Sequence, residues 1–224
     1  MRDKAIYFLC IVAALLLAND IYHIASLPQE RMQGDAFKII FFHVPVAFTA
    51  LAAAGVSLIA SVLFLVTRNF QFDALAVSVT EVGLAFLAAN LVTGSIWGRV
   101  IWGIWWTWDA RLTSALICWV LYASYLMLRR SIDEPTQRAN FAAVFSIFCF
   151  IDVPIVIFSI KWWRTQHPQP VFWAGGSFPS GWAPYFWMNV LAMILFGTAL
   201  TLLRLRDEQS QRELESLRRM ANAY

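Results

Sequence analysis

The chain has 224 residues, of which 60% are hydrophobic and 14% are charged, and its mean hydropathy is +0.61. This composition is too apolar for a soluble domain of that size and indicates an integral membrane protein. The net charge of +3 is small enough to follow from a bias of basic residues toward one side of a bilayer, so it gives no reason to expect a nucleic-acid partner.

Six apolar stretches predict membrane-spanning helices, because a helix needs about 20 apolar residues to cross the hydrocarbon layer. They cover residues 6–20, 39–67, 77–96, 112–128, 141–160 and 183–203. The first is a retained span rather than a signal peptide, since Ala18-Asn19-Asp20 is a poor cleavage site. The sequence therefore predicts an all-α integral membrane protein, with one six-span domain over residues 1–203 and a C-terminal tail over residues 204–224.

The distribution of lysine and arginine predicts the orientation of these spans. With six spans, 11 of the 17 basic residues fall on the side that holds both termini. Basic residues in short loops favour the cytoplasmic side, so we expect both termini to lie in the cytoplasm. In a bacterial inner membrane, the connectors 20–38, 97–111 and 161–182 would then face the periplasm.

Tryptophans concentrate in or beside these three outer connectors. Nine of the 11 tryptophans do so: Trp97, Trp102, Trp105, Trp106, Trp108, Trp162, Trp163, Trp173 and Trp182. An aromatic belt would occupy both membrane interfaces, whereas the inner connectors have no tryptophan. We therefore favour an aromatic platform for a flat, apolar partner. Tryptophans recur at three- and four-residue steps in residues 97–111, so an interfacial helix is one possible form of this segment.

Polar residues inside the spans have structural as well as functional readings. Glu81 and Asn90 are expected to pair with other helices. Asp152 lies near the middle of its span, two residues before Pro154, and serves either a local kink or a partner contact. The three cysteines lie within spans, form no paired motif and are read as small core residues.

All three histidines lie on the tryptophan-rich side of the membrane. A single histidine near an interface is usually a hydrogen-bonded bystander, but His43 and His167 flank the tryptophan-rich connector. Iron porphyrin is flat and largely apolar and takes imidazole as an axial ligand, so it would use both features. Its carboxylates need cations, and the nearby outer ones are Arg99, Arg111, Lys161 and Arg164. Only neutral imidazole ligates iron, so we expect haem loss as the pH falls through about 6.

Three segments carry a family resemblance that covers most of the chain. They are "FFHVPVAF", "WGIWWTWDARLTS" and "SIKWWRTQH". Together they resemble the CcmC family, which handles haem in bacterial cytochrome c maturation. The resemblance implies that His43 and His167 are axial ligands of the haem iron, whereas His23 matches no family motif. It further implies a haem-contacting stretch from Trp97 to Arg111, with Trp97, Trp102, Trp105, Trp106, Trp108 and Asp109 as its contacts. The need of the haem carboxylates for cations adds Arg99, Arg111 and Arg164 to this set.

The same resemblance implies partners and a function. The chain would bind haem b transiently on its periplasmic face and pass it to the haem chaperone CcmE. It would do so within a complex that contains the ABC transporter subunits CcmA and CcmB and the small membrane protein CcmD. The sequence has neither a CxxCH motif for covalent haem attachment nor a GxxxxGK[ST] motif for ATP binding. We therefore expect non-covalent binding in a transfer component that is not an enzyme.

Two alternatives stay open at this stage. The chain could be a haem-conducting permease subunit, although its spans offer few polar groups to line a path. It could also be a membrane scaffold whose tryptophans hold an apolar protein surface without any cofactor. Copurification of haem separates the scaffold from the other two functions.

Overall fold

A computed structural model shows an all-helical protein and describes residues 2–168 and 178–221. Its elements are α1 (Arg2–Ser26), the short 3₁₀ helix η1 (Asp35–Ile39), α2 (Ile40–Thr67), α3 (Phe70–Trp102), α4 (Ala110–Arg130), α5 (Pro135–Phe150), α6 (Asp152–Trp162) and α7 (Ala183–Ala221). Six helical stretches in the described part are long and apolar enough to cross a membrane, which confirms the predicted number of spans. η1 and α2 form one of these stretches, and α5 and α6 form another.

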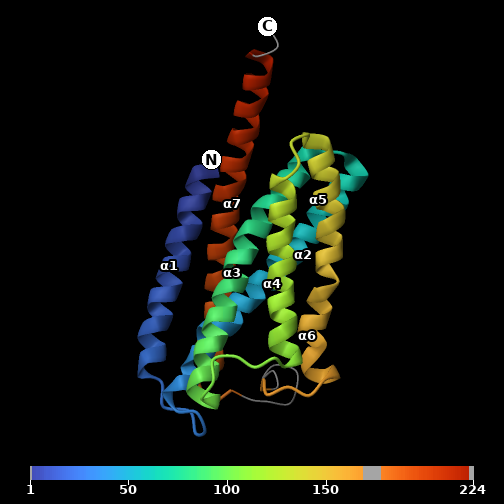
Figure 1. Cartoon of the computed structure of the whole chain (residues 1–224). Helices are drawn as coiled ribbons and strands as arrows, with labels where there is room; N and C mark the ends of the chain where they lie inside the picture. The colour runs from blue at the N-terminus through green and yellow to red at the C-terminus, as the bar shows by residue number, and fades with distance from the viewer. Residues whose placement is uncertain (1, 169–177, 222–224) are drawn as a thin grey trace.

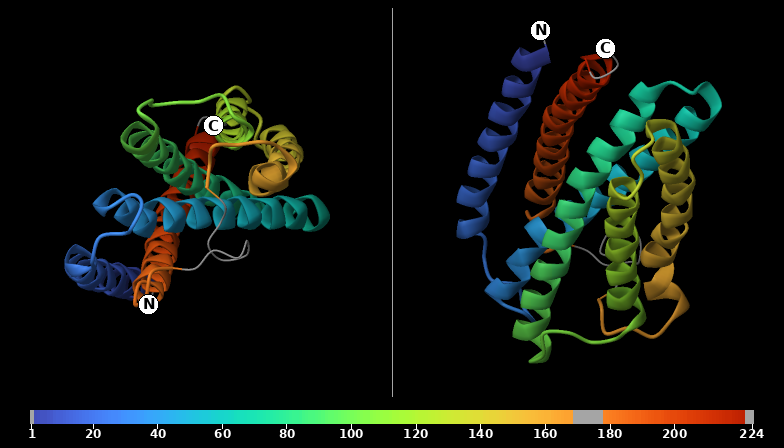
Figure 2. Two further views of the ribbon diagram at one scale, coloured as in Figure 1. Left: turned by 90° about the horizontal axis from the view of Figure 1, so that it is seen from below. Right: turned by 45° about the horizontal axis from the view of Figure 1, so that its top comes forward.

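The bundle is arranged around α2 and α3 (Figure 1). Helices α4, α5 and α6 pack on one side of this pair, and α1 and α7 lie on the other side, as the views in Figure 2 also show. Small residues permit the close approach of α2 and α3: a Cβ atom at Gly83 would lie only 2.7 Å from Cβ of Ala53. Helices that cross this closely gain van der Waals contact. Such contact drives helix association in a bilayer, because lipid tails are as apolar as the side chains and the hydrophobic effect gives no preference for protein contacts.

Both ends of the described chain lie at the same end of the bundle. In Figure 1, α1 begins and α7 ends at the top, whereas the connectors 27–39, 103–109 and the described parts of 163–182 lie at the bottom. The short connections between α2 and α3 and between α4 and α5 lie at the end that holds the termini. The two ends therefore differ in the way the sequence predicts, with the histidine- and tryptophan-rich connectors grouped together.

Ion pairs fasten three helices at the end that holds the termini. Arg129 of α4 donates two hydrogen bonds to the buried carboxylate of Asp73 on α3, at 2.6 and 3.0 Å. Arg212 of α7 donates to the same carboxylate at 2.7 Å and to Glu208 at 2.8 Å. Glu81 accepts from Arg204 of α7, which confirms that it pairs with another helix. The 39-residue α7 continues through residue 203 without interruption, so the predicted tail extends a spanning helix.

The fifth span is divided into two helices. α5 ends at Phe150, and α6 begins at Asp152 and carries Pro154 in its first turn. Proline has no N–H to donate to the carbonyl four residues earlier, so a continuous helix loses a bond there. A local kink was one of the two roles open for Asp152, and the helix is interrupted at this point. Cys118 and Cys149 lie in the hydrophobic core, as expected for small apolar side chains.

The tryptophan-rich segment is not a separate surface helix, so that possible form of residues 97–111 is wrong. Its first part, to Trp102, forms the last turns of α3, and residues 103–109 are irregular. Gly103 ends α3 in the left-handed conformation with φ of 75°, which glycine adopts without steric cost. Asp109 then caps the start of α4. A glycine stop and an acidic cap therefore override the helical spacing of the tryptophans.

Candidate functional site

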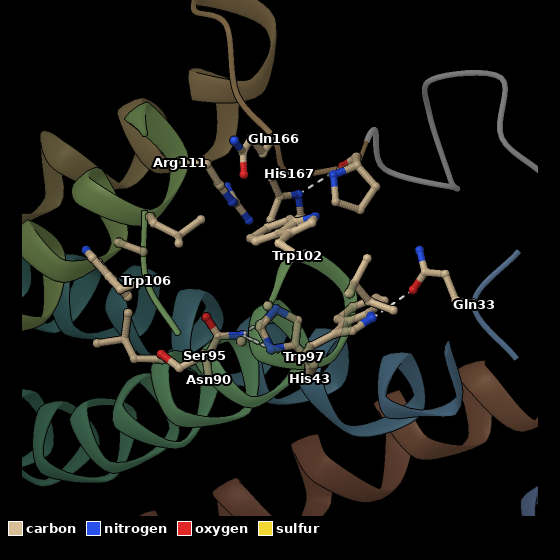
Figure 3. Close-up of a pocket in the computed structure, with 17 residues that line it drawn as sticks. Gln33, His43, Asn90, Ser95, Trp97, Trp102, Trp106, Arg111, Gln166 and His167 are labelled. Carbon is tan, nitrogen blue, oxygen red and sulfur yellow. Dashed lines mark hydrogen bonds between the residues drawn. The ribbon is translucent and has the colours of Figure 1, made fainter. Parts of the chain in front are cut away.

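A cavity opens at the end of the bundle opposite the termini. It lies among α2, the last turns of α3, the start of α4 and the loop that follows α6, and its empty volume is about 820 Å³. This volume includes open solvent at the mouth of the cavity, so the enclosed space is smaller. Figure 3 shows its lining, which consists of Gln33, His43, Asn90, Leu91, Gly94, Ser95, Trp97, Gly98, Ile101, Trp102, Trp106, Arg111, Leu112, Ala115, Gln166, His167 and Pro168.

His43 reaches the cavity from the first turn of α2. Its Nδ1 lies 2.9 Å from Oγ1 of Thr93 on α3. The Thr93 hydroxyl already donates its single proton to backbone carbonyls of α3, so it accepts from His43 Nδ1–H. With the proton on Nδ1, Nε2 carries the lone pair that a ligand would use, and the Asn90 amide nitrogen lies 3.4 Å from it.

Asn90 also fixes His43. Its amide Nδ2 donates to the backbone carbonyl of His43 at 3.0 Å and lies 3.3 and 3.4 Å from the two ring nitrogens. This contact joins α3 to α2, which confirms that Asn90 pairs with another helix. Because the contact is at His43 itself, Asn90 supports the site as well as the bundle.

His167 reaches the same cavity from the loop after α6. Its Nδ1 lies 2.9 Å from the carbonyl oxygen of Pro168, which can only accept, so Nδ1 carries the proton and Nε2 carries the lone pair. Burial and then the positive charge of Arg111 lower the pKa of His167 to about 4, although the Pro168 hydrogen bond and Asp109 act in the opposite direction. The imidazole is therefore neutral at physiological pH.

Three of the five predicted tryptophans line the cavity. Trp97 donates from Nε1 to Oε1 of Gln33 at 2.8 Å and meets the His43 ring edge-on, with the ring centres 5.7 Å apart. The Trp102 ring lies between the two imidazoles in Figure 3. Trp106 forms part of another wall. The cavity is thus walled by flat aromatic surfaces in addition to its two imidazoles.

The other two tryptophans face outward. Trp105 and Trp108 are 60% and 77% exposed and do not line the cavity. Trp162 and Trp163 at the end of α6 are also more than half exposed, while Trp182 is fully buried in a separate core cluster. Trp173 lies outside the described residues. The predicted platform therefore divides into cavity walls and an exposed aromatic surface.

The predicted charged residues also divide. Arg111 lines the cavity and donates to the backbone carbonyl of Val156. Arg99 lies over the Trp105 ring and donates to the carbonyl of Gly103, and Arg164 is exposed, so neither lines the cavity. Asp109 does not line it either, because its carboxylate is hydrogen-bonded to the loop that carries His167. Arg111 is thus the one predicted cation that the described lining includes.

Two glycines on α3 leave space for the side chains of His43 and Trp102. A Cβ at Gly94 would lie 3.0 Å from Cε1 of His43, and one at Gly98 would lie 3.2 Å from Cε3 of Trp102. Sequence reasoning missed Gly94, Thr93 and Gln33, whereas Gly98 was expected to let a planar ligand approach the backbone. The signal was present, since residues 90, 94 and 98 repeat at four-residue spacing and place small or polar side chains on one face of α3.

This arrangement suits a flat, apolar molecule that carries a metal. Two neutral imidazoles supply nitrogen ligands, indole rings supply apolar walls, and a guanidinium supplies a partner for an anion. Over residues 2–168 and 178–221, no group of three His, Cys, Asp or Glu side chains could hold a bare metal ion. The site therefore does not resemble one that binds metal through protein ligands alone.

Comparison with known proteins shows the family of this chain. Residues 1–220 match the model of the CcmC family, heme exporter protein C. Heme exporter protein C of Bradyrhizobium diazoefficiens is 39% identical over 223 residues, which cover 98% of this chain and 84% of that protein. The protein of the same name from Escherichia coli K12 is 30% identical over 180 residues, which cover 80% of this chain and 73% of that protein. A putative cytochrome c biosynthesis ccmC-like mitochondrial protein of Marchantia polymorpha is 38% identical over 143 residues, or 64% of this chain and 60% of that protein. The chain belongs to the heme exporter protein C family.

Proposed function

We propose that this protein serves haem export in cytochrome c maturation by capturing haem b between Nε2 of His43 and Nε2 of His167. The observation that carries the proposal is that two imidazoles, 124 positions apart in the sequence (167 less 43), line one cavity with both Nδ1 atoms engaged. Trp97 and Trp106 would contact the porphyrin, Trp102 would move out of the space between the two imidazoles and stack on it, and Arg111 would pair with a propionate. Haem is the cargo, so its binding is non-covalent and transient.

The proposal includes an orientation and a recipient. The bias of basic residues favours termini in the cytoplasm, so the cavity would face the periplasm of a bacterial inner membrane. CcmE would receive the haem there, and the exposed rings of Trp105 and Trp108 beside the cavity offer it a surface. The CcmA, CcmB and CcmD proteins would complete the complex. The exposed aromatic side chains let the recipient approach without any opening of the bundle.

The test is an absorption spectrum of the detergent-purified protein, oxidised and reduced, after coexpression with CcmE. We expect a low-spin haem spectrum, since two imidazoles hold the iron. Incubation with haem-free CcmE should then move haem from this protein to CcmE. A protein that carries no haem under any loading condition would instead support the scaffold function. Haem uptake into the interior of reconstituted vesicles would support the permease function.

The lowered pKa of His167 predicts the pH range of haem retention. His167 stays neutral until the pH falls to about 4, so protons do not compete with iron for its Nε2 between about pH 7 and pH 5. We expect retained haem over this range and release as the pH approaches 4, measured by the low-spin absorption after a pH drop. The lowered pKa thus places the expected release below the value near pH 6 that an unperturbed imidazole predicts. Half-release near the ordinary pKa of histidine would contradict it.

A side chain at Gly94 should displace His43. The Cβ of Gly94→Val would lie about 3 Å from the imidazole, closer than ordinary contact, so the ring must shift or tilt away from the iron. We expect loss of most copurified haem at unchanged protein yield. Gly55→Val on α2 is the matched control, because a Cβ at that position meets nothing within 4 Å. Equal haem content in the two variants would contradict the prediction.

A further inference from the structure

Both carboxylate oxygens of Asp109 accept hydrogen bonds from the protein, although Asp109 does not line the cavity. Its Oδ1 accepts from the backbone N–H of Leu112 at 3.0 Å and so caps α4. Its Oδ2 accepts from the Thr165 hydroxyl at 2.8 Å and from the backbone N–H of Gln166 at 3.2 Å. The carboxylate thus joins the start of α4 to the loop after α6, across 56 positions of sequence for the Thr165 contact.

The Thr165 hydroxyl links Asp109 to His167 through two hydrogen bonds. Its hydroxyl donates its one proton to Asp109 and accepts from the backbone N–H of His167 at 3.0 Å. An ionised carboxylate makes stronger hydrogen bonds than a neutral acceptor. The residues of this loop from Trp163 to Pro168 form no helix or strand, so these bonds replace the regular structure that would otherwise orient the histidine.

We propose that Asp109 is a positioning residue that holds His167 at the cavity, through Thr165 and the backbone of Gln166. It acts on the ligand rather than on haem, since its two oxygens are engaged with the protein and it does not line the cavity. The same residue sets the start of α4, two positions before the cavity residue Arg111. The Asp109 carboxylate therefore fixes the position of the proposed ligand His167 relative to Arg111. This inference rests on the proposed function.

The competing explanation is that Asp109 only caps α4. Two substitutions distinguish this capping role from the positioning of His167. Asp109→Ser keeps a good N-cap residue, but a single hydroxyl attached to Cβ replaces the carboxylate, so the Thr165 hydroxyl loses its acceptor. Thr165→Val keeps the shape of the side chain and the complete α4 cap, and removes only the hydroxyl that joins Asp109 to His167. Thr165→Ser restores that hydroxyl.

The experiment compares the spectra of these variants, each copurified with haem after coexpression with CcmE. We expect Asp109→Ser and Thr165→Val to shift haem from low spin to high spin, as His167→Ala does, because the ligand no longer stays over the iron. Added imidazole should return all three to low spin, and Thr165→Ser should match the wild type. Asn69→Ala is the capping control, since Asn69 caps α3 far from the cavity by accepting from Gln71 N–H, and its spectrum should not change.

Two results overturn the inference in distinguishable ways. If His167→Ala loses the low-spin spectrum while Thr165→Val and Asp109→Ser keep it, the positioning role is wrong and the proposed function stands. If His167→Ala itself keeps the wild-type spectrum, the proposed ligand is wrong and the positioning role fails with it. Thr165→Val leaves the cap intact, so the comparison holds even where Asp109→Ser does not fold.

Discussion

His43→Ala and His167→Ala are each expected to abolish the low-spin haem spectrum. Loss of a hydrogen-bonded partner of a metal ligand typically weakens metal binding about 10- to 100-fold, so loss of the ligand itself should weaken haem retention at least that much. The measurement is the haem content per protein and the absorption spectrum after identical purification. Added imidazole should restore low-spin absorption, because it fills the vacated coordination position.

His23→Ala is the matched control for these variants. His23 lies on the same side of the bundle, but its ring stacks on Tyr185 with the ring centres 5.1 Å apart, and it does not line the cavity. Its removal costs an aromatic contact and should leave the haem spectrum unchanged. If all three histidine variants lose haem equally, the loss reflects damage to this end of the bundle rather than to axial ligation.

Asp73→Ala is expected to destabilise the folded protein more than any surface substitution. The side chains of Asp73 and Arg129 are only 5% and 7% exposed, and Arg212 depends on the same carboxylate. Removal of one partner from a buried pair leaves an uncompensated charge and costs roughly 3–5 kcal/mol. Thermal unfolding in detergent, followed by the loss of helical circular dichroism, measures this effect.

The exposed pair of Asp3 and Arg206 provides the comparison. Its atoms lie 3.0 Å apart, but the two side chains are 65% and 45% exposed, so water already solvates both charges. Asp3→Ala should therefore change the unfolding temperature little, because exposed pairs contribute almost nothing net. Similar shifts in Asp3→Ala and Asp73→Ala would mean that burial of the Asp73 cluster does not set its contribution.

The sequence predicted the spans well because each is a continuous apolar run, and burial in lipid demands such runs whatever the packing. It predicted helix ends less well. Residues 77–96 were expected as a span, whereas α3 covers Phe70–Trp102, since Asn69 caps one end and Gly103 stops the other. It also gave residues 141–160 as one span and left open whether a kink lies beside Asp152, whereas the structure divides the span into α5 and α6. The length of an apolar run follows the thickness of the hydrocarbon layer, whereas capping residues determine where the helix itself begins and ends.

The site shows the same division. His43, His167 and the tryptophans could be selected because their residue types are unusual and lie on one side of the membrane. Thr93 and Gly94 could not, since their importance depends on the contact between α2 and α3. Likewise, the separation of Trp102 from Trp105 depends on where Gly103 bends the chain. Single-sequence periodicity describes one helix at a time, whereas a cavity is a property of several.

The two imidazoles sit on supports of unequal stiffness. His43 belongs to the long helix α2 and is braced by α3, whereas His167 belongs to an irregular loop. Haem held by one ligand on a helix and one on a loop would be released in a fixed order. The loop can move once its hydrogen bonds to Asp109 break, while every helical hydrogen bond stays. A recipient that engages the loop first would free one face of the iron while the other face stays held. The haem iron would then stay coordinated by at least one of the two proteins throughout the transfer.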